Sequence, residues 1–142
     1  MHVHTVHYEP LTVCLSGGRN ATSSGTTVVT VTGEVDASTV AELATALGGA
    51  IDSAPQACVI DLSHVDFLSI AAAEILADGH ARAALRNLDL HLVPGRAARH
   101  TLVATDLLDT FRCHRTTATA VDDIRAERAH QQDTTSSHAQ AS

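Results

Sequence analysis

Residues 57–62, Ala57-Cys58-Val59-Ile60-Asp61-Leu62, form a nearly continuous apolar run. A strand with one wet face alternates apolar and polar residues, whereas an unbroken apolar run is expected of a strand that is covered on both faces. Strands of that kind occur in parallel sheets with helices packed against them. The stretch therefore predicts a central strand of an α/β sheet, and the flanking segments can be interpreted outward from it.

The segment before this strand predicts a strand and then a helix. Residues 27–32 are Thr or Val throughout, and β-branched side chains favour a pleated strand. Apolar residues then recur at helical spacing over residues 40–51, which predicts a helix with one buried face. The stripe that we expect to be buried comprises Val40, Leu43, Ala44, Leu47 and Ile51.

The segment after the central strand predicts a second helix and a third strand. Residues 70–87 have helical periodicity, and Ser69 stands at the position of an N-cap. Asp78 precedes Arg82 by four residues, a spacing that favours an ion pair along one helix. Residues 88–93 predict the third strand. The expected buried stripe of the helix comprises Ala72, Ile75, Leu76, Gly79 and Ala83.

The outer segments complete the series. Residues 97–104 predict a short helix, residues 111–114 a strand, and residues 117–128 a last helix, while residues 11–15 predict a first strand. Strands that alternate with helices over short connections imply parallel strands joined by right-handed crossovers. The predicted fold is a single α/β domain with a mixed, mostly parallel sheet of four to five strands and about four helices.

The composition along the chain predicts where the folded domain begins and ends. A chain of 142 residues fits one domain. Residues 1–10 show no clear periodicity and are interpreted as an N-terminal extension, residues 11–128 as the folded domain, and residues 129–142, which are small and polar, as a disordered tail.

Charge and hydropathy exclude several classes of partner. The net charge is −7, with nine Arg and no Lys, so the chain would be repelled by nucleic-acid phosphates. No stretch approaches the roughly 18 consecutive apolar residues of a membrane-spanning helix, so we expect no direct membrane insertion. The start of the chain lacks the pattern of a signal peptide, and the three Cys residues are too few for a disulfide framework. These features predict a cytoplasmic protein with free thiols.

One edge of the predicted sheet collects the polar side chains. The carboxyl ends of parallel strands share an edge, where functional loops gather. Residues 34–36, 61–64 and 94–96 follow predicted strands and should meet there. The helix over residues 70–87 begins at the same edge, with its first amides pointing outward. Residues 61–73 are therefore the expected working surface.

Two segments of this edge resemble those of a known family. Gly33-Glu34-Val35-Asp36 resembles the GELD segment of STAS domains, and residues 59–68 (VIDLSHVDFL) resemble the strand and loop that lead into the family's regulatory helix. The resemblance is to the anti-sigma factor antagonist type and covers residues 27–125. It implies a non-enzymatic module without a cofactor that docks on an anti-sigma factor or a related kinase-like protein. The partner-binding positions that we expect are Asp36, Asp61, Ser63, Ser69, Ile70, Ala71, Ala72 and Ala73.

The resemblance also points to a missing regulatory group. In regulatory members of the family, an anti-sigma factor kinase phosphorylates a Ser or Thr in a segment of the type apolar-Asp-Ser-[Ser/Thr]-Gly. Here Ser69 takes the place of the aspartate and Ala71 that of the phosphoacceptor. The resemblance implies a module that is not switched at residue 71, and leaves Ser69 as either a substitute acceptor or a helix cap. Asp106 replaces the glycine of the family's Thr-Gly-Leu turn.

Other functions fit the same sequence. The chain could be a STAS accessory subunit of a transporter or of a sensory assembly, or a sensor of a small ligand or nucleotide. Asp36 and Asp61 could be a carboxylate pair for acid–base chemistry, but we interpret them as caps of backbone amides.

Candidate metal ligands are scattered. His2, His4, His7 and Cys14 lie in a segment that offers no fixed geometry, so we expect no metal there. Cys113 and His114 are adjacent on a predicted strand, so their side chains should point to opposite faces and cannot share an ion.

Overall fold

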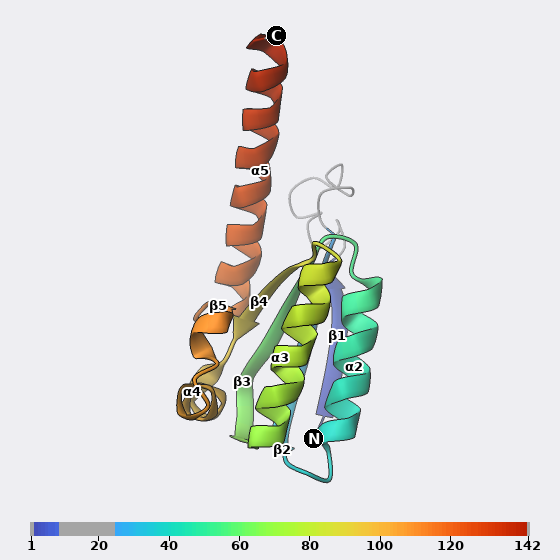
Figure 1. The fold of residues 1–142 in the computed structure, drawn as a ribbon, viewed down its shortest axis with the longest axis vertical. Coiled ribbons are helices and arrows are strands. Elements are labelled where there is room, and N and C mark those ends of the chain that lie inside the picture. Colours follow the sequence, from blue (N-terminus) through green and yellow to red (C-terminus); the bar gives the residue numbers. More distant parts are fainter. Residues whose placement is uncertain (1, 9–24, 142) are drawn as a thin grey trace.

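The structure, a computed structural model, describes the backbone of residues 2–8 and 25–141. Within these ranges five strands form one sheet in the order β1-β2-β3-β4-β5 (Figure 1). β1 is antiparallel to β2, and all the other neighbours are parallel. The strands are β1 (His2–Tyr8), β2 (Thr26–Val35), β3 (Ala57–Leu68), β4 (Asp89–Val93) and β5 (Arg112–Cys113).

The helices of the described part lie on both faces of this sheet. They are α2 (Val40–Ser53), α3 (Ile70–Leu85), α4 (Gly95–Ala104) and α5 (Thr117–Ala141), with a 3₁₀ turn, η2, at Leu108–Thr110. Residues of α2, α3 and α4 share one buried cluster with alternate residues of the strands. A second cluster joins Val59 and Val93 on the other face to Ile124 of α5. The predicted α/β class and mixed sheet are confirmed.

β3 is buried on both faces, as its apolar run predicts. Cys58, Ile60 and Leu62 point into the cluster under α2, α3 and α4, whereas Ala57 and Val59 point toward α5. All five side chains are fully buried. Since burying one such aliphatic side chain contributes about 1.5–3 kcal/mol, this strand is a main source of the fold's stability.

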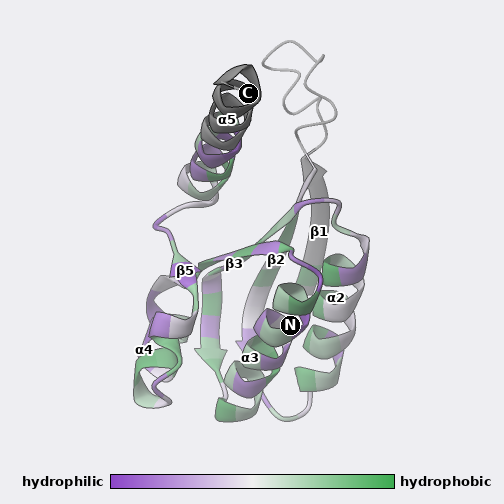
Figure 2. Ribbon diagram, turned by 45° about the horizontal axis from the view of Figure 1, so that its top comes forward, coloured by the Kyte–Doolittle hydropathy of each residue, from purple (hydrophilic) through white to green (hydrophobic). Residues whose placement is uncertain are grey.

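The helices over residues 40–51 and 70–87 are confirmed with small changes in their buried faces. In Figure 2, apolar segments of α2 and α3 alternate with polar ones along each helix, as expected where one side packs on a sheet. Ser69 is the N-cap of α3, and its Oγ accepts a hydrogen bond from the Ala72 amide at 3.1 Å. Fully buried members of the predicted stripes are Leu43, Leu47, Ile51, Ala72, Leu76, Gly79 and Ala83, while Val40, Ala44 and Ile75 are half-buried.

The expected ion pair within α3 is replaced by one between helices. Arg82 binds Asp52 of α2, with Nε 3.0 Å from Oδ1 and Nη2 2.5 Å from Oδ2. Because both carboxylate oxygens are engaged, this bidentate pair has better geometry than a single contact with Asp78. Its side chains are about half exposed, so its main effect is to fix how α2 and α3 lie side by side.

The N-terminal segment contains a strand that its sequence did not indicate. Residues 2–8 form β1 and pair with β2 along its whole length, from His2 opposite Thr32 to Tyr8 opposite Thr26. An edge strand buries few side chains, so it carries a weak apolar pattern; Val3, which packs against the core, is the side chain described here. The strand predicted over residues 11–15 lies outside the described residues.

The C-terminal helix is longer than expected. We expected helix to residue 128 and a disordered tail over residues 129–142, but α5 continues to Ala141. Residues 129–141 contain Ala and Gln, which favour helices, and they contain no proline or glycine that would end a helix. α5 thus runs past the boundary expected at residue 128, while the boundary expected at residue 10 lies outside the described residues.

β3 also extends further than predicted. A loop was expected from about residue 63, but the strand continues to Leu68 and pairs with β2 there. The register with β2 shifts twice, between Thr30 and Thr32 and between Gly33 and Glu34. Such bulges break the two-residue alternation of side chains, which is the signal by which a strand is recognised in a sequence.

Gly79 permits the close approach of α3 to α2. A Cβ atom at this position would lie 2.7 Å from Cδ2 of Leu47 and 3.2 Å from Cδ1 of Ile51. Gly49, on α2, has open space around the same position.

We expect Gly79→Val to lower the free energy of unfolding by about 1–3 kcal/mol, because the added atoms overpack a filled core. Gly49→Val is the matched control and should change the free energy of unfolding by less than about 0.5 kcal/mol, since Val and Gly differ little in helix propensity. Urea denaturation of both variants measures the effect. Equal stability of the two variants would contradict this packing.

Candidate functional site

The end of β2 and the start of α3 meet at one edge of the sheet, at the bottom of Figure 1. Val35 pairs with Leu68, and the amide of Ser69 donates to the carbonyl of Val35 at 2.9 Å. Asp36 is therefore beside the first turn of α3. The structure brings together these two parts of the predicted partner-binding surface.

The first turn of α3 presents an apolar surface to solvent. Ile70 is 62% exposed and Phe67, just before the helix, is 50% exposed, and Ala71 is also exposed. Ala72 and Ala73 are fully buried in the core. Among the predicted positions on this helix, Ile70 and Ala71 are accessible to a partner, and Ala72 and Ala73 instead let α3 pack closely on the sheet.

Asp36 organises the turn that leads into α2. Its Oδ1 accepts hydrogen bonds from the Ser38 amide at 2.9 Å and from the Ser38 hydroxyl at 2.7 Å. These bonds to Ser38 lower the pKa of Asp36 from its ordinary value, and Thr39 contributes in the same direction. The carboxylate therefore stays charged and holds its own loop, which agrees with its interpretation as a cap.

Asp61 and Ser63 lie apart from the first turn of α3. Asp61 pairs with Val93 at the end of β4, seven residues before Leu68, which corresponds to about 20 Å of strand at about 3.3 Å per residue. Its Oδ2 accepts a hydrogen bond from Thr117 at 3.1 Å, so it holds the start of α5 on the opposite face. The predicted surface is thus divided into two regions along β3.

Ser63 lies between a carboxylate and an imidazole. Its hydroxyl donates to Oδ1 of Asp61 at 2.6 Å and lies 3.2 Å from Nδ1 of His64. In a catalytic triad the histidine lies between the serine and the acid and removes the serine proton. Here the serine hydroxyl donates its hydrogen bond to the carboxylate, in an exposed position, and the histidine does not lie between them. This is the arrangement of a turn and not that of an activated nucleophile.

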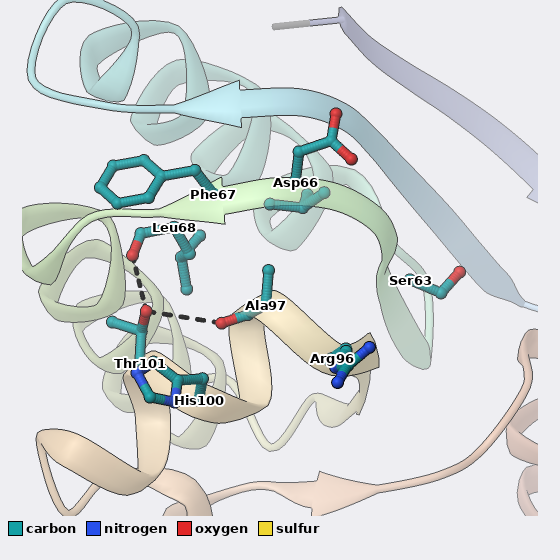
Figure 3. A pocket seen from close by; sticks show the side chains of 9 residues that line it. Ser63, Asp66, Phe67, Leu68, Arg96, Ala97, His100 and Thr101 are labelled. Carbon is teal, nitrogen blue, oxygen red and sulfur yellow. Dashed lines mark hydrogen bonds between the residues drawn. The ribbon is translucent and has the colours of Figure 1, made fainter.

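An open cavity of about 560 Å³ connects the two regions, between β3 and α4 (Figure 3). Ser63 and Arg96 lie at one end and Phe67 at the other, while Leu68 and Ala97 face each other across it. The Thr101 hydroxyl donates to the carbonyl of Leu68 at 2.7 Å and holds α4 at that end.

Gly95 holds α4 against β3 at the other end of the cavity. Its φ is +68°, and a Cβ atom there would lie 2.6 Å from Cα of Ser63. A side chain would be strained by the backbone conformation and would collide with backbone atoms of β3. Glycine is therefore required where the strand and the helix touch.

A polar network on the opposite face links the sheet to α5, and the sequence analysis did not predict it. His91 of β4 is fully buried, with Nδ1 2.8 Å from Nε2 of His114 and Nε2 3.0 Å from Oδ2 of Asp89. His114 Nδ1 lies 3.3 Å from Asp123 of α5. A histidine between Leu90 and Leu92 was the available signal. Cys113, next to His114, packs on the other face, which confirms their predicted opposite directions.

The same network gathers three groups that could ligate a cation. Ligand atoms of Asp89, His91 and Glu127 all lie within 4.8 Å of one another. However, Arg112 contacts both Glu127 and Asp89, so its guanidinium already balances this charge. A divalent ion would have to displace the arginine.

We therefore expect purified, untagged protein to contain no stoichiometric Zn²⁺ or Cu²⁺, with the His residues near the N-terminus included in this expectation. Elemental analysis measures it directly. About one metal per chain would contradict the charge balance, and its loss in a His91→Gln variant would place the ion in this network.

The network should make stability fall in mild acid. Burial lowers the pKa of His114 from its ordinary value of 6.5, and the neighbouring His91 adds to the effect. Below about pH 6.5 the unfolded chain therefore binds a proton that the folded chain still excludes, and the free energy of unfolding decreases as the pH falls. Asp89, whose pKa is lowered chiefly by the hydrogen bond from His91, adds a further loss below 3.8, its ordinary pKa.

Urea denaturation at about pH 7.5 and about pH 5.5 tests this expectation. His114→Gln should show a smaller decrease in the free energy of unfolding than the unsubstituted protein. His64→Gln, at an exposed position outside the network, is the control and should leave the decrease unchanged. Equal decreases with and without His114 would show that this histidine is not the group that titrates.

The cysteines of the described part are both free thiols. Cys58 is buried in the core, and burial raises its pKa to about 12; Cys113 is half-buried. A thiol with so high a pKa is a poor nucleophile and metal ligand. In the same ranges of the chain, no helix has the length and apolar character needed to span a membrane.

Comparison with protein families identifies the fold family. The STAS domain model matches residues 19–120, which is most of the chain. The chain belongs to the STAS domain family. A search of curated proteins finds no match.

Solved structures of STAS proteins have the same fold. An anti-sigma factor antagonist from Mycobacterium paratuberculosis is 34% identical, with a TM-score of 0.65 over 71% of this chain and 86% of its own. SpoIIAA in its unphosphorylated form, an anti-sigma factor antagonist, is 16% identical, with a TM-score of 0.61 over 71% of this chain and 89% of its own. The second likeness concerns the fold alone. This STAS domain thus resembles anti-sigma factor antagonists, a type that is typically non-enzymatic.

The structure explains one departure from the family pattern. Asp106, in place of the family's glycine, has a φ of +60° at the end of α4. Its amide donates to the Val103 carbonyl at 3.1 Å, and the Leu107 amide donates to the Leu102 carbonyl at 2.8 Å. This is the bonding of a helix end that favours glycine, and Asp is among the residues that tolerate the left-handed conformation.

Proposed function

We propose that this STAS domain is a regulatory module that docks on an anti-sigma factor or a related kinase-like protein, without catalysis and in the cytoplasm. The observation that carries the proposal is the 34% identity to an anti-sigma factor antagonist over 86% of that protein's chain. The exposed apolar surface of Phe67, Ile70 and Ala71 supports it, because exposed apolar patches mark protein–protein contacts.

The docking surface of the proposal is the edge where β2 ends and α3 begins. Phe67 and Ile70 supply apolar contact area, and Ala71 lies beside them on the outer side of the helix. Asp36 shapes the neighbouring turn through its bonds to Ser38. A rigid helix start held by a capped Ser69 gives the partner a surface that need not be ordered on binding.

The proposed module has no phosphorylation switch at the family's position. A phosphate at residue 71 would bring a charge of about −1.5 to −2 onto this apolar surface. Alanine cannot accept one, so we propose constitutive binding. Ser69 is a poor substitute acceptor, because its Oγ caps the helix by accepting from Ala72.

Ala71→Glu should weaken the complex at least about tenfold, because a carboxylate would have to be desolvated in the interface. Ala81→Glu is the matched control: it makes the same change at an exposed site of α3, about three turns further on, and should leave the affinity unchanged. Calorimetric titration with each purified anti-sigma factor of the source organism measures both.

The same titrations separate the switch from the docking surface. Ser69→Ala should cost about 0.5–2 kcal/mol of folding stability with little loss of affinity. Unchanged affinity of Ala71→Glu would place the docking surface elsewhere. If phosphorylation is found at Ser69 or Ser63 and abolishes binding, the module has a phosphorylation switch at that serine instead of at residue 71.

A further inference from the structure

The cavity between β3 and α4 lies next to the proposed docking surface and is lined by both apolar and polar side chains. Its volume of about 560 Å³ lies within the usual range of binding pockets. Leu68 and Ala97 face each other across it, and Phe67 lies at its outer end (Figure 3). An apolar side chain of a partner that covers Phe67 could therefore enter the cavity and contact Leu68 and Ala97.

One wall of this cavity is basic, although the chain as a whole is acidic. The net charge is −7, yet α4 exposes Arg96 and His100, which line the cavity, and Arg99, which does not. Among the described residues these three side chains make no ion pair or hydrogen bond. Arg82 and Arg112, by contrast, are bound to carboxylates. The charge on α4 is therefore available to a partner.

Asp66, the acidic residue that lines the cavity, is turned away from α4. It is exposed and points toward β2 in Figure 3. Glu34, opposite Phe67 in the β2–β3 ladder, is also exposed and does not line the cavity. Because the Asp66 carboxylate is directed away from α4, the charged side chain that faces a ligand on the α4 side is Arg96.

We infer that the cavity receives an acidic segment of the partner protein, in which an apolar side chain is flanked by carboxylates. The apolar side chain fills the space between Leu68 and Ala97, and the carboxylates contact Arg96 and His100. The inference rests on the proposed function for the existence of a protein partner and adds the chemistry of the segment that docks.

Two synthetic peptides test this inference without the partner. The acidic probe is acetyl-Glu-Asp-Leu-Asp-Glu-amide, and the basic probe is acetyl-Lys-Arg-Leu-Arg-Lys-amide. The net charge of −7 favours the basic probe, whereas the charge on α4 favours the acidic one, so the two views predict opposite results. Titration of the ¹⁵N-labelled full chain, followed by amide chemical shifts at low salt, measures which probe binds and where.

We expect the acidic probe to shift the amides of residues 63–68 and 96–101 in a saturable way, and the basic probe to leave them unchanged. Arg96→Glu should weaken the acidic probe at least about tenfold by reversing the charge. Ala97→Phe should do the same by filling the cavity. Arg125→Glu on α5, across the sheet, is the charge-matched control and should have no effect. The unchanged spectrum of each variant away from the cavity confirms that it is folded.

Three results would overturn the inference: no saturable shift at residues 63–68 and 96–101, equal shifts with the basic probe, or unchanged binding in Arg96→Glu. Each would leave the proposed function standing if Ala71→Glu still weakened the complex with an anti-sigma factor. Conversely, the acidic probe could bind while every anti-sigma factor fails to bind. That result would support the cavity's preference for acidic segments and would contradict the proposed partner.

Discussion

The parallel pairing of β3 with β2 on one side and β4 on the other determines where each functional segment lies. β3 is a long strand, and its two neighbours cover different parts of it: β4 pairs with its first half, up to Asp61, whereas β2 continues to Leu68. The half that β4 leaves uncovered is where α4 packs and where the cavity opens. A shorter β3 would bring the start of α3 down to the end of β4 and leave no room for either.

The two ends of the part of β3 that extends beyond β4, Asp61 and Leu68, hold different helices in place. Asp61 holds Ser63 and, through Thr117, the first turn of α5 on one face of the sheet. Seven residues later, Leu68 accepts a hydrogen bond from Thr101 of α4, and Ser69 begins α3 on the other face. One strand thus positions the start of α5 and a solvent-facing apolar surface. The apolar surface stays exposed because α5 is held to the sheet at Asp61 and not at the edge where α3 begins.

The sequence predicted those features whose signals are local. The apolar run at residues 57–62, the helix after Ser69 and the cap itself follow from spacing and side-chain type alone, and all three are confirmed. The extension of β3 was missed because its bulges break the alternation of side chains, and β1 because an edge strand buries little. His91 and His114 lie 23 residues apart, so their contact depends on the register of β4 with β5. The division of the predicted site at Asp61 depends in the same way on how far β3 extends.

Hydrogen–deuterium exchange of the full chain, with and without a purified anti-sigma factor, tests the central claim most directly. If the edge at the end of β2 and the start of α3 is the docking surface, binding should slow exchange at residues 34–38 and 66–73. Residues 117–128 of α5, on the opposite face, should exchange at the same rate in both samples. Slower exchange confined to α5, or to residues 2–8, would contradict the assignment and place the interface on another part of the molecule.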